Sequence, residues 1–329
     1  MESNVLYPLP FFPIYKDKIW GGDKVKTILN KDFSPLKNCG EMWLLSGCEN
    51  DVSLVSDGPL AENDLNELLE IFFDDLIGDK RFDDKNVKFP LLVKVIDSQS
   101  WLSIQVHPDD AMAKSLGYDN GKSEMWYILD AEPGAKIIAG FNKVVTRQEY
   151  EKHVEENTLE EILNYIPVEK GDTIYIPAGL VHALGPGLLV AEIQQPSDIT
   201  YRISDWNRVD AEGKPRELHL ELAAQAIDFS EDGCPRIIKN REYQQNTRIE
   251  LVNCEYFNTN VIVVTDKLDF TFDTEDTFIA FMAVEGSGSI TSNSITTNIK
   301  RGEVVLLPAM LEDYSISADE PLKLIEMYV

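Results

Sequence analysis

The sequence predicts a mainly β protein with two β-barrels of related design and a few inserted helices. Three observations support this prediction. Most of the chain consists of short apolar runs between Gly- and Pro-containing turns, one strand-and-turn motif occurs twice, and helical periodicity is limited to three segments. The 329 residues are enough for two domains.

The strands are predicted from apolar, β-branched runs. Residues 88–97 and 101–108 form two such runs with turn chemistry between them. Residues 124–142 predict a hairpin whose turn lies at 132–134, where Glu-Pro-Gly occurs. From residue 256 onward the pattern is again one of strands with few helical signals.

Three segments have the spacing of amphipathic helices. They cover residues 62–77, 146–166 and 216–229. The second begins with Thr146 followed three residues later by Glu149, the pattern of a capping box.

A repeated octapeptide indicates an internal duplication. GDTIYIPA begins at Gly171 and GEVVLLPA begins at Gly302, and each predicts a turn, a buried strand and a loop. The turn-rich segment 230–235 is the expected linker between the two halves. We therefore predict an N-terminal domain over 1–229 and a C-terminal β domain over 230–329.

The charge balance limits the partners. With 57 acidic and 30 basic residues the formal net charge is −27, which repels nucleic acid and anionic membranes. No run of about 18 apolar residues predicts a membrane span, and no basic and apolar leader is apparent at the start. An anionic substrate would need a locally basic pocket.

The cysteines predict a reducing compartment. Cys39, Cys48, Cys234 and Cys254 are too few for a disulfide framework and contain no C-x-x-C pair. We expect buried thiols in a cytoplasmic protein.

The first octapeptide continues into a motif that resembles one known superfamily. Gly171, Pro177, Gly179 and His182 have the spacing of the second motif of the cupins, jelly-roll barrels in which this histidine is a metal ligand. The fold expected is therefore two cupin-like (jelly-roll) barrels. In the second copy the histidine position is Asp313, so we predict that the later barrel binds no metal.

Other ligand candidates lie upstream of this motif. Gln105 and His107 share one face of a predicted strand with Ser103, because alternate residues point to the same side. Glu124 lies near the start of the next strand. With His182 these side chains offer two imidazole nitrogens and two oxygens, a set suited to Zn²⁺ at about 2.0–2.2 Å.

At the level of a family, the chain resembles the short bacterial type I phosphomannose isomerases. The resemblance covers nearly the whole chain to about residue 225, whereas the C-terminal third matches only in length and β character. The matching segments are WGG (20–22), GEMWLLSG (40–47), QVHPDD (105–110), GKSEMWYI (121–128), GDTIYIPAGLVHAL (171–184) and EIQQPSDITYRISDWNR (192–208).

The resemblance implies an aldose–ketose isomerase that interconverts mannose 6-phosphate and fructose 6-phosphate with one zinc ion per chain. The family's metal ligands fall on Gln105, His107, Glu124 and His182. Its active-site lysine falls on Lys122, its essential arginine on Arg202, and the acidic residues before that arginine on Glu192 and Asp198.

Each of these residues has an expected role. Arg202 would stabilise developing negative charge, and Lys122 would transfer a proton in ring opening. Glu192 is the first candidate for the base at C1/C2, with Asp198 as its rival or an orienting group. The substrate-binding residues expected are Trp20, Ser103, Lys122 and Arg202, and Lys94 or a base of loop 206–214 could also bind the phosphate.

Two other functions remain open at this stage. One is a different metal-dependent cupin enzyme, either another sugar isomerase or an iron dioxygenase, although dioxygenases generally have an H-x-H pair where this chain has Gln105 and His107. The other is a non-catalytic sugar-phosphate-binding protein. The sequence leaves open whether the protein is a monomer or a homodimer.

Overall fold

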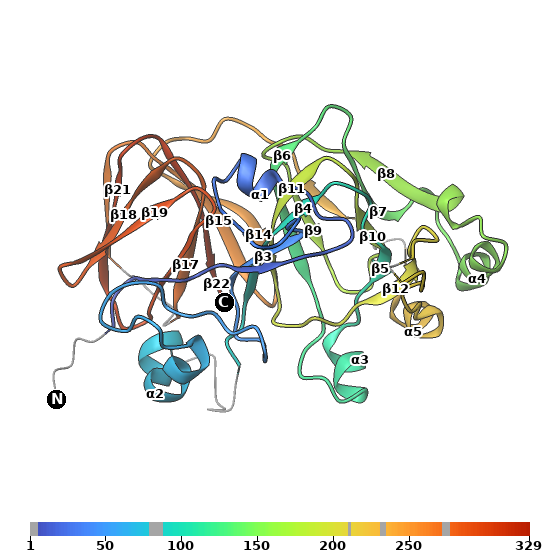
Figure 1. The fold of residues 1–329 in the computed structure, drawn as a ribbon, viewed down its shortest axis with the longest axis horizontal. Helices are drawn as coiled ribbons and strands as arrows, with labels where there is room; N and C mark the ends of the chain where they lie inside the picture. Colours follow the sequence, from blue (N-terminus) through green and yellow to red (C-terminus); the bar gives the residue numbers. More distant parts are fainter. Residues whose placement is uncertain (1–5, 79–87, 210–211, 231–234, 272–276) are drawn as a thin grey trace. The chain divides into compact units, whose positions relative to one another are not determined.

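The predicted mainly β architecture is confirmed in the computed structural model, whose described residues form 22 strands and five α-helices (Figure 1). The structure describes residues 6–78, 88–209, 212–230, 235–271 and 277–329. Among these residues no helix is both long and apolar enough to cross a membrane.

The chain forms two compact units that interleave along the sequence. The central unit contains residues 15–41 and 95–240, and the terminal unit contains the described parts of 1–14, 42–94 and 241–329. The sequence predicts a single division, at residue 230. The chain passes from one unit to the other four times: within the three strands β2 (Ile14–Lys16), β3 (Glu41–Leu45) and β4 (Leu92–Ser98), and again between Asn240 and Arg241.

Backbone pairing explains why N-terminal segments join the C-terminal strands. Leu9 of β1 (Leu9–Pro10) pairs with Leu306 of β20 (Val304–Leu307). The carbonyl of Leu76, near the end of helix α2 (Leu65–Ile77), accepts from the N–H of Ala309. Local sequence carries no signal of such distant pairings.

The central unit is built from two facing groups of strands. One sheet has the order β12-β5-β10-β7-β8, and a second contains β13, β9, β6, β11 and β4 side by side. The strands not yet bounded are β5 (Ile104–Val106), β6 (Glu124–Ala131), β7 (Lys136–Phe141), β8 (Leu163–Pro167), β9 (Thr173–Ile176), β10 (His182–Leu184), β11 (Leu188–Gln194), β12 (Tyr201–Ser204) and β13 (Arg236–Ile238).

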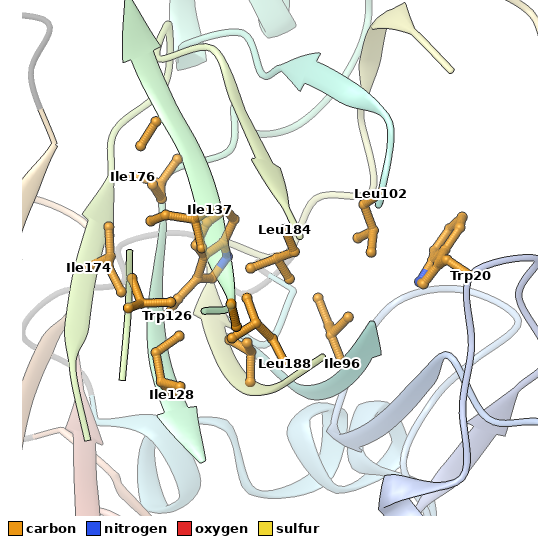
Figure 2. Packing of buried hydrophobic residues seen from close by; sticks show 14 of the residues in the cluster. Trp20, Ile96, Leu102, Trp126, Ile128, Ile137, Ile174, Ile176, Leu184 and Leu188 are labelled. Atoms are coloured by element: carbon orange, nitrogen blue, oxygen red, sulfur yellow. The ribbon is translucent and has the colours of Figure 1, made fainter. Parts of the chain in front are cut away.

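The expected hairpin over 124–142 is wrong. β6 pairs with β9 and β11, whereas β7 pairs with β8 and β10, so the turn carries the chain from one sheet to the other. Ile128 of β6 and Ile137 of β7 therefore reach one shared core from opposite sides (Figure 2). Two apolar strands separated by a turn have the same sequence pattern whether they pair with each other as a hairpin or belong to two different sheets.

The helices are shorter than their sequence patterns. The segment 146–166 contains α4 (Arg147–Glu155), a 3₁₀ turn (Leu159–Ile162) and then β8. The capping box of Thr146 and Glu149 is confirmed. The helix ends before Asn157, whose φ of 56° lies in the left-handed region that terminates helices.

Two of the other helices begin at side-chain caps. Asp64 caps α2 in a capping box with Glu67, and Asp109 caps α3 (Asp110–Ser115) by accepting from the N–H of Met112. The remaining helices are α1 (Lys24–Thr27) and α5 (Leu220–Ala226).

The terminal unit also has two sheets. Their orders are β1-β20-β17-β22-β15-β14 and β16-β21-β18-β19, around a separate apolar core. The further strands are β14 (Arg248–Asn253), β15 (Asn258–Val264), β16 (Lys267–Thr271), β17 (Ile279–Glu285), β18 (Ser287–Ser292), β19 (Ile295–Lys300), β21 (Asp313–Ala318) and β22 (Leu322–Tyr328).

The two copies of the octapeptide adopt the same local structure. Gly171 and Gly302 have φ of 90° and 80°, and each precedes a short strand, β9 or β20. Each unit therefore contains one copy of the predicted turn and strand.

Candidate metal centre and active site

Three residues of the candidate site lie in register on neighbouring strands of the first sheet of the central unit. Gln105 of β5 pairs with His182 of β10 on one side and with Arg202 of β12 on the other. Ile104 and Val106 flank Gln105 and pack into the apolar core that also holds residues of α5. Because strand residues alternate in direction, the side chain of Gln105 points away from that core.

Glu124 and His107 complete a buried cluster. Glu124 begins β6, and its carboxylate oxygens lie 3.6 Å from His107 Nε2 and 3.5 Å from His182 Nε2. All three side chains are at most 1% exposed. One ligand atom from each lies within 4.8 Å of the others, and among the described residues this is the only such group of three His, Cys, Asp or Glu side chains.

Backbone carbonyls orient both imidazole rings. His107 Nδ1 is 2.7 Å from the oxygen of Ile199, and His182 Nδ1 is 2.8 Å from the oxygen of Leu180. A carbonyl only accepts, so each Nδ1 carries the proton and each Nε2 presents a lone pair toward Glu124. Burial lowers the pKa of His182, which favours the neutral form that metal ligands require.

The donor set fits a metal ion. Both oxygens of Glu124 are buried without a well-aligned hydrogen bond, although Lys122 Nζ forms an ion pair with Oε2 at 2.7 Å. A buried carboxylate facing two imidazole lone pairs is stabilised by a divalent cation.

Gln105 lies beside this cluster, and its side-chain amide nitrogen faces His182. Its Nε2 is 3.3 Å from His182 Nε2, and its Oε1 accepts from Ser103 Oγ at 3.1 Å. The amide nitrogen therefore donates to the imidazole lone pair in this rotamer. Ligation through oxygen requires a half-turn of the amide, which exchanges the two atoms.

Two more ionisable groups face the cluster. Lys122 Nζ lies 3.1 Å from His107 Nε2 and 3.9 Å from Glu192 Oε1. The side chains of Lys122 and Glu192 are almost fully buried. Trp126 Nε1 donates to Glu192 Oε2 at 2.9 Å. The arrangement places a buried carboxylate and a buried ammonium group beside the cluster of His107, Glu124 and His182.

Arg202 is half-buried at the edge of this site. Its Nη1 donates to the oxygen of Glu217 at 2.8 Å, and its Nε has no hydrogen-bond partner among the described residues. Burial lowers the pKa of Arg202, and the positive charges of Arg216 and Arg208 lower it further.

The arginine cluster is only partly visible in the sequence. Asp205 accepts from Arg208 and Arg216, and Arg216 also stacks over the Trp20 ring at 5.1 Å. Arg208 lies within the loop that the sequence analysis proposed as a source of a base, whereas Arg216 was missed. The sequence signal was three arginines within 15 residues of a strongly acidic chain.

The remaining predicted residues are spread more widely. Trp20 is 8% exposed and belongs to the apolar core of the central unit, as Figure 2 shows. Ser103 is buried against Gln105. Asp198 is exposed on the loop between β11 and β12. Lys94 belongs to the terminal unit, where its ammonium lies 5.2 Å from the Trp43 ring centre.

Known proteins share both the sequence pattern and the fold. Residues 9–139 match the family model "Phosphomannose isomerase type I, catalytic domain", and residues 247–329 match "Mannose-6-phosphate isomerase, cupin domain". The chain is 34% identical over 318 residues to mannose-6-phosphate isomerase ManA of Bacillus subtilis, covering 94% of this chain and 95% of the relative. A mannose-6-phosphate isomerase of Streptococcus mutans is 32% identical, covering 92% of each chain.

Solved structures give the same result. The crystal structure of the mannose 6-phosphate isomerase from Bacillus subtilis superimposes with a TM-score of 0.87 at 31% identity, covering 98% of this chain and 100% of that one. A putative mannosephosphate isomerase from Archaeoglobus fulgidus has a TM-score of 0.76 at 22% identity, covering 99% of each chain, which supports the fold alone.

Proposed function

The chain belongs to the type I phosphomannose isomerase family, and we propose that it catalyses the reversible interconversion of mannose 6-phosphate and fructose 6-phosphate. The observation that carries this proposal is the buried juxtaposition of Lys122 and Glu192 with the cluster of His107, Glu124 and His182. A protein that only bound sugar phosphates would not need a buried acid and base beside a metal site.

The proposed cofactor is one Zn²⁺ per chain. His107, Glu124 and His182 would hold it, with Gln105 as a fourth ligand after rotation of its amide. Two neutral imidazoles and one carboxylate form a set that zinc favours, and a neutral fourth ligand leaves net positive charge. When bound, the ion supplies Lewis-acid polarisation of sugar oxygens.

Glu192 is the proposed base at C1/C2. The reaction moves a proton between the two carbons of the open-chain sugar, and one carboxylate can take it from one carbon and return it to the other. Glu192 is only 3% exposed, whereas Asp198 is exposed. A base shielded from water retains its proton between the two steps, so burial favours Glu192 over Asp198.

Lys122 is the proposed acid in ring opening. Its ammonium lies between the carboxylates of Glu124 and Glu192, at 2.7 and 3.9 Å. From this position Nζ can donate a proton to the ring oxygen and accept it back when the ring closes.

Arg202 is proposed to stabilise negative charge on the substrate. Its unsatisfied Nε and the nearby Arg208 and Arg216 create a local excess of positive charge in a chain of net charge −27. Ser103 is proposed as a further contact to the substrate.

A cytoplasmic location is part of the same proposal. Cys39 is a buried free thiol, as is common in a reducing compartment.

The test is a coupled assay of mannose 6-phosphate conversion with metal analysis of the same sample. We expect turnover with about one zinc per chain, loss of turnover on chelation, and recovery on adding Zn²⁺. Glucose 6-phosphate serves as the control substrate. A zinc-loaded, folded protein that binds mannose 6-phosphate without converting it would contradict the proposal.

A further inference from the structure

Trp126 connects the proposed base to a proposed metal ligand. It lies on β6 directly opposite Glu192 of β11 in the antiparallel ladder. Opposed residues of neighbouring strands project from the same face of a sheet, so both side chains enter the interior of the central unit. The indole Nε1 donates to Glu192 Oε2 at 2.9 Å.

This hydrogen bond determines which carboxylate oxygen faces the acid. The indole N–H is a donor only, and it takes Oε2 of Glu192. The other oxygen, Oε1, is then the one directed toward Lys122 Nζ at 3.9 Å. Glu192 is 3% exposed and Trp126 is 1% exposed. If the indole N–H were removed, bulk water could therefore not easily replace it as the hydrogen-bond donor to Glu192.

The indole ring is itself immobilised. Its edge packs against the His182 ring with centroids 5.5 Å apart and an interplanar angle of 75°. The ring also belongs to the apolar core of the central unit, and Figure 2 shows it among Ile128, Ile137 and Ile174. A close-packed core of this kind holds a large ring in one rotamer, so the direction of its N–H is fixed.

We propose that Trp126 is a positioning residue of the isomerase, which acts through Glu192 by holding the carboxylate in the orientation needed for proton transfer at carbon. This inference rests on the proposed function. Proton abstraction from carbon depends steeply on the placement of the base, whereas binding of the sugar phosphate does not involve this bond. Loss of the N–H therefore affects kcat and leaves KM almost unchanged.

The test uses Trp126→Phe, which removes the N–H and keeps an aromatic ring. We expect kcat to fall about 10–100-fold, with KM changed by less than about threefold and the same metal content as the wild type. Trp101→Phe is the matched control, because its ring packs on Tyr165 and Trp206 away from Glu192, and it should keep wild-type kcat.

A second substitution separates loss of the N–H from loss of side-chain packing. Replacement of Trp126 by 3-benzothienylalanine retains the shape of the indole and exchanges only the N–H for sulfur. We expect it to lose as much kcat as Trp126→Phe. Wild-type kcat in the benzothienyl protein would overturn the proposal, because the ring alone would then be sufficient.

A double-mutant cycle separates a positioning role from a structural one. If Trp126 acts through Glu192, then Trp126→Phe costs nothing further in a Glu192→Gln background. An equal fold-loss in both backgrounds would overturn the proposal. Full kcat in Glu192→Gln alone would also overturn it while leaving the isomerase function intact, whereas an inactive wild-type enzyme would refute the proposed function itself.

Discussion

At the scale of single residues, the two histidines of the proposed metal site are oriented by contacts outside the cluster. Carbonyls of Ile199 and Leu180 fix the Nδ1 side of each ring, so the orientation of Nε2 does not depend on the metal. Such outer contacts raise metal affinity because the ligands pay little ordering entropy on binding. Removal of one imidazole should therefore weaken metal binding without unfolding the protein.

His182→Ala should abolish metal binding and turnover together. The variant leaves Glu124 with one imidazole partner, so we expect metal affinity to fall by at least about 100-fold. His153→Ala is the matched control, because His153 lies on α4 with its Nδ1 at Thr158. Metal content by mass spectrometry and the isomerase assay check the result, and a zinc-loaded His182→Ala protein would contradict the assignment.

Asp97 is a buried carboxylate outside the cluster, and we expect it to affect stability. Its Oδ2 accepts from the N–H of Lys24 at the start of α1, and its Oδ1 is buried without a hydrogen-bond partner among the described residues. Burial raises the pKa of Asp97 to about 6, above its ordinary value of 3.8. The folded state therefore holds this proton at pH values where the unfolded chain has released it.

The sign of the resulting pH dependence is that stability falls as pH rises from about 4 to about 6. Asp97→Asn keeps an oxygen acceptor for Lys24 and carries no charge. It should match the wild type near pH 4 and exceed its free energy of unfolding at pH 8 by up to roughly 3 kcal/mol. Urea denaturation at the two pH values measures this, and an equal difference at both pH values would disprove the role of the charge.

At the scale of elements, the sequence predicts the positions of strands and helix caps well, but it predicts poorly which strands pair with each other. The capping box at Thr146 and the cap at Asp109 are local chemistry, so they could be read directly from neighbouring residues. The pairing of β6 with β9 and β11 depends on residues about 45 to 70 positions away. Alternation of apolar residues shows which face of a strand is buried but leaves the neighbouring strand undetermined.

The candidate site shows the same division. His107 and His182 could be predicted because each lies in a short motif with fixed spacing. The bond from Trp126 to Glu192 could not, because it depends on the register between two strands. Asp198 lies close to Arg202 in sequence, and its exposure follows from the course of the loop between β11 and β12.

At the same scale, Gly179 is a backbone position beside the candidate site that is sensitive to substitution. It has φ of 85°, its N–H donates to the oxygen of His107, and an added Cβ would lie 3.2 Å from the oxygen of Ala226. Gly179→Ala should therefore reduce stability by about 1–2 kcal/mol and weaken metal binding. Gly213→Ala is the matched control, with φ of 81° and no atom of the described residues within 4 Å of an added Cβ.

These two glycine variants separate backbone strain from loss of the site. Thermal unfolding with and without added Zn²⁺ measures both effects. We expect both variants to lose stability, and only Gly179→Ala to show a smaller stabilisation by zinc. Equal stabilisation of the two variants would mean that the turn at Gly179 does not position the ligands.

At the scale of the whole molecule, each compact unit draws on segments that are far apart in the chain. The terminal unit combines β1 with β20 and α2 with the loop at Ala309. Composition gave no sign of this interleaving, because both units contain similar apolar strands. By contrast, the net charge of −27 is a property of the sequence alone and has a direct physical consequence.

Self-repulsion among the acidic residues should make the protein more stable in salt. The screening length falls from about 10 Å at 0.1 M to about 3 Å at 1 M, and exposed ion pairs lose little in exchange because each contributes at most about 1 kcal/mol. We expect the midpoint of thermal unfolding at pH 7 to rise by a few degrees between these NaCl concentrations. Near the sequence pI of about 4.4, where the net charge vanishes, the same salt increase should have little effect. A midpoint that falls with salt at pH 7 would show that specific ion pairs, such as Lys24 with Asp130, outweigh the repulsion.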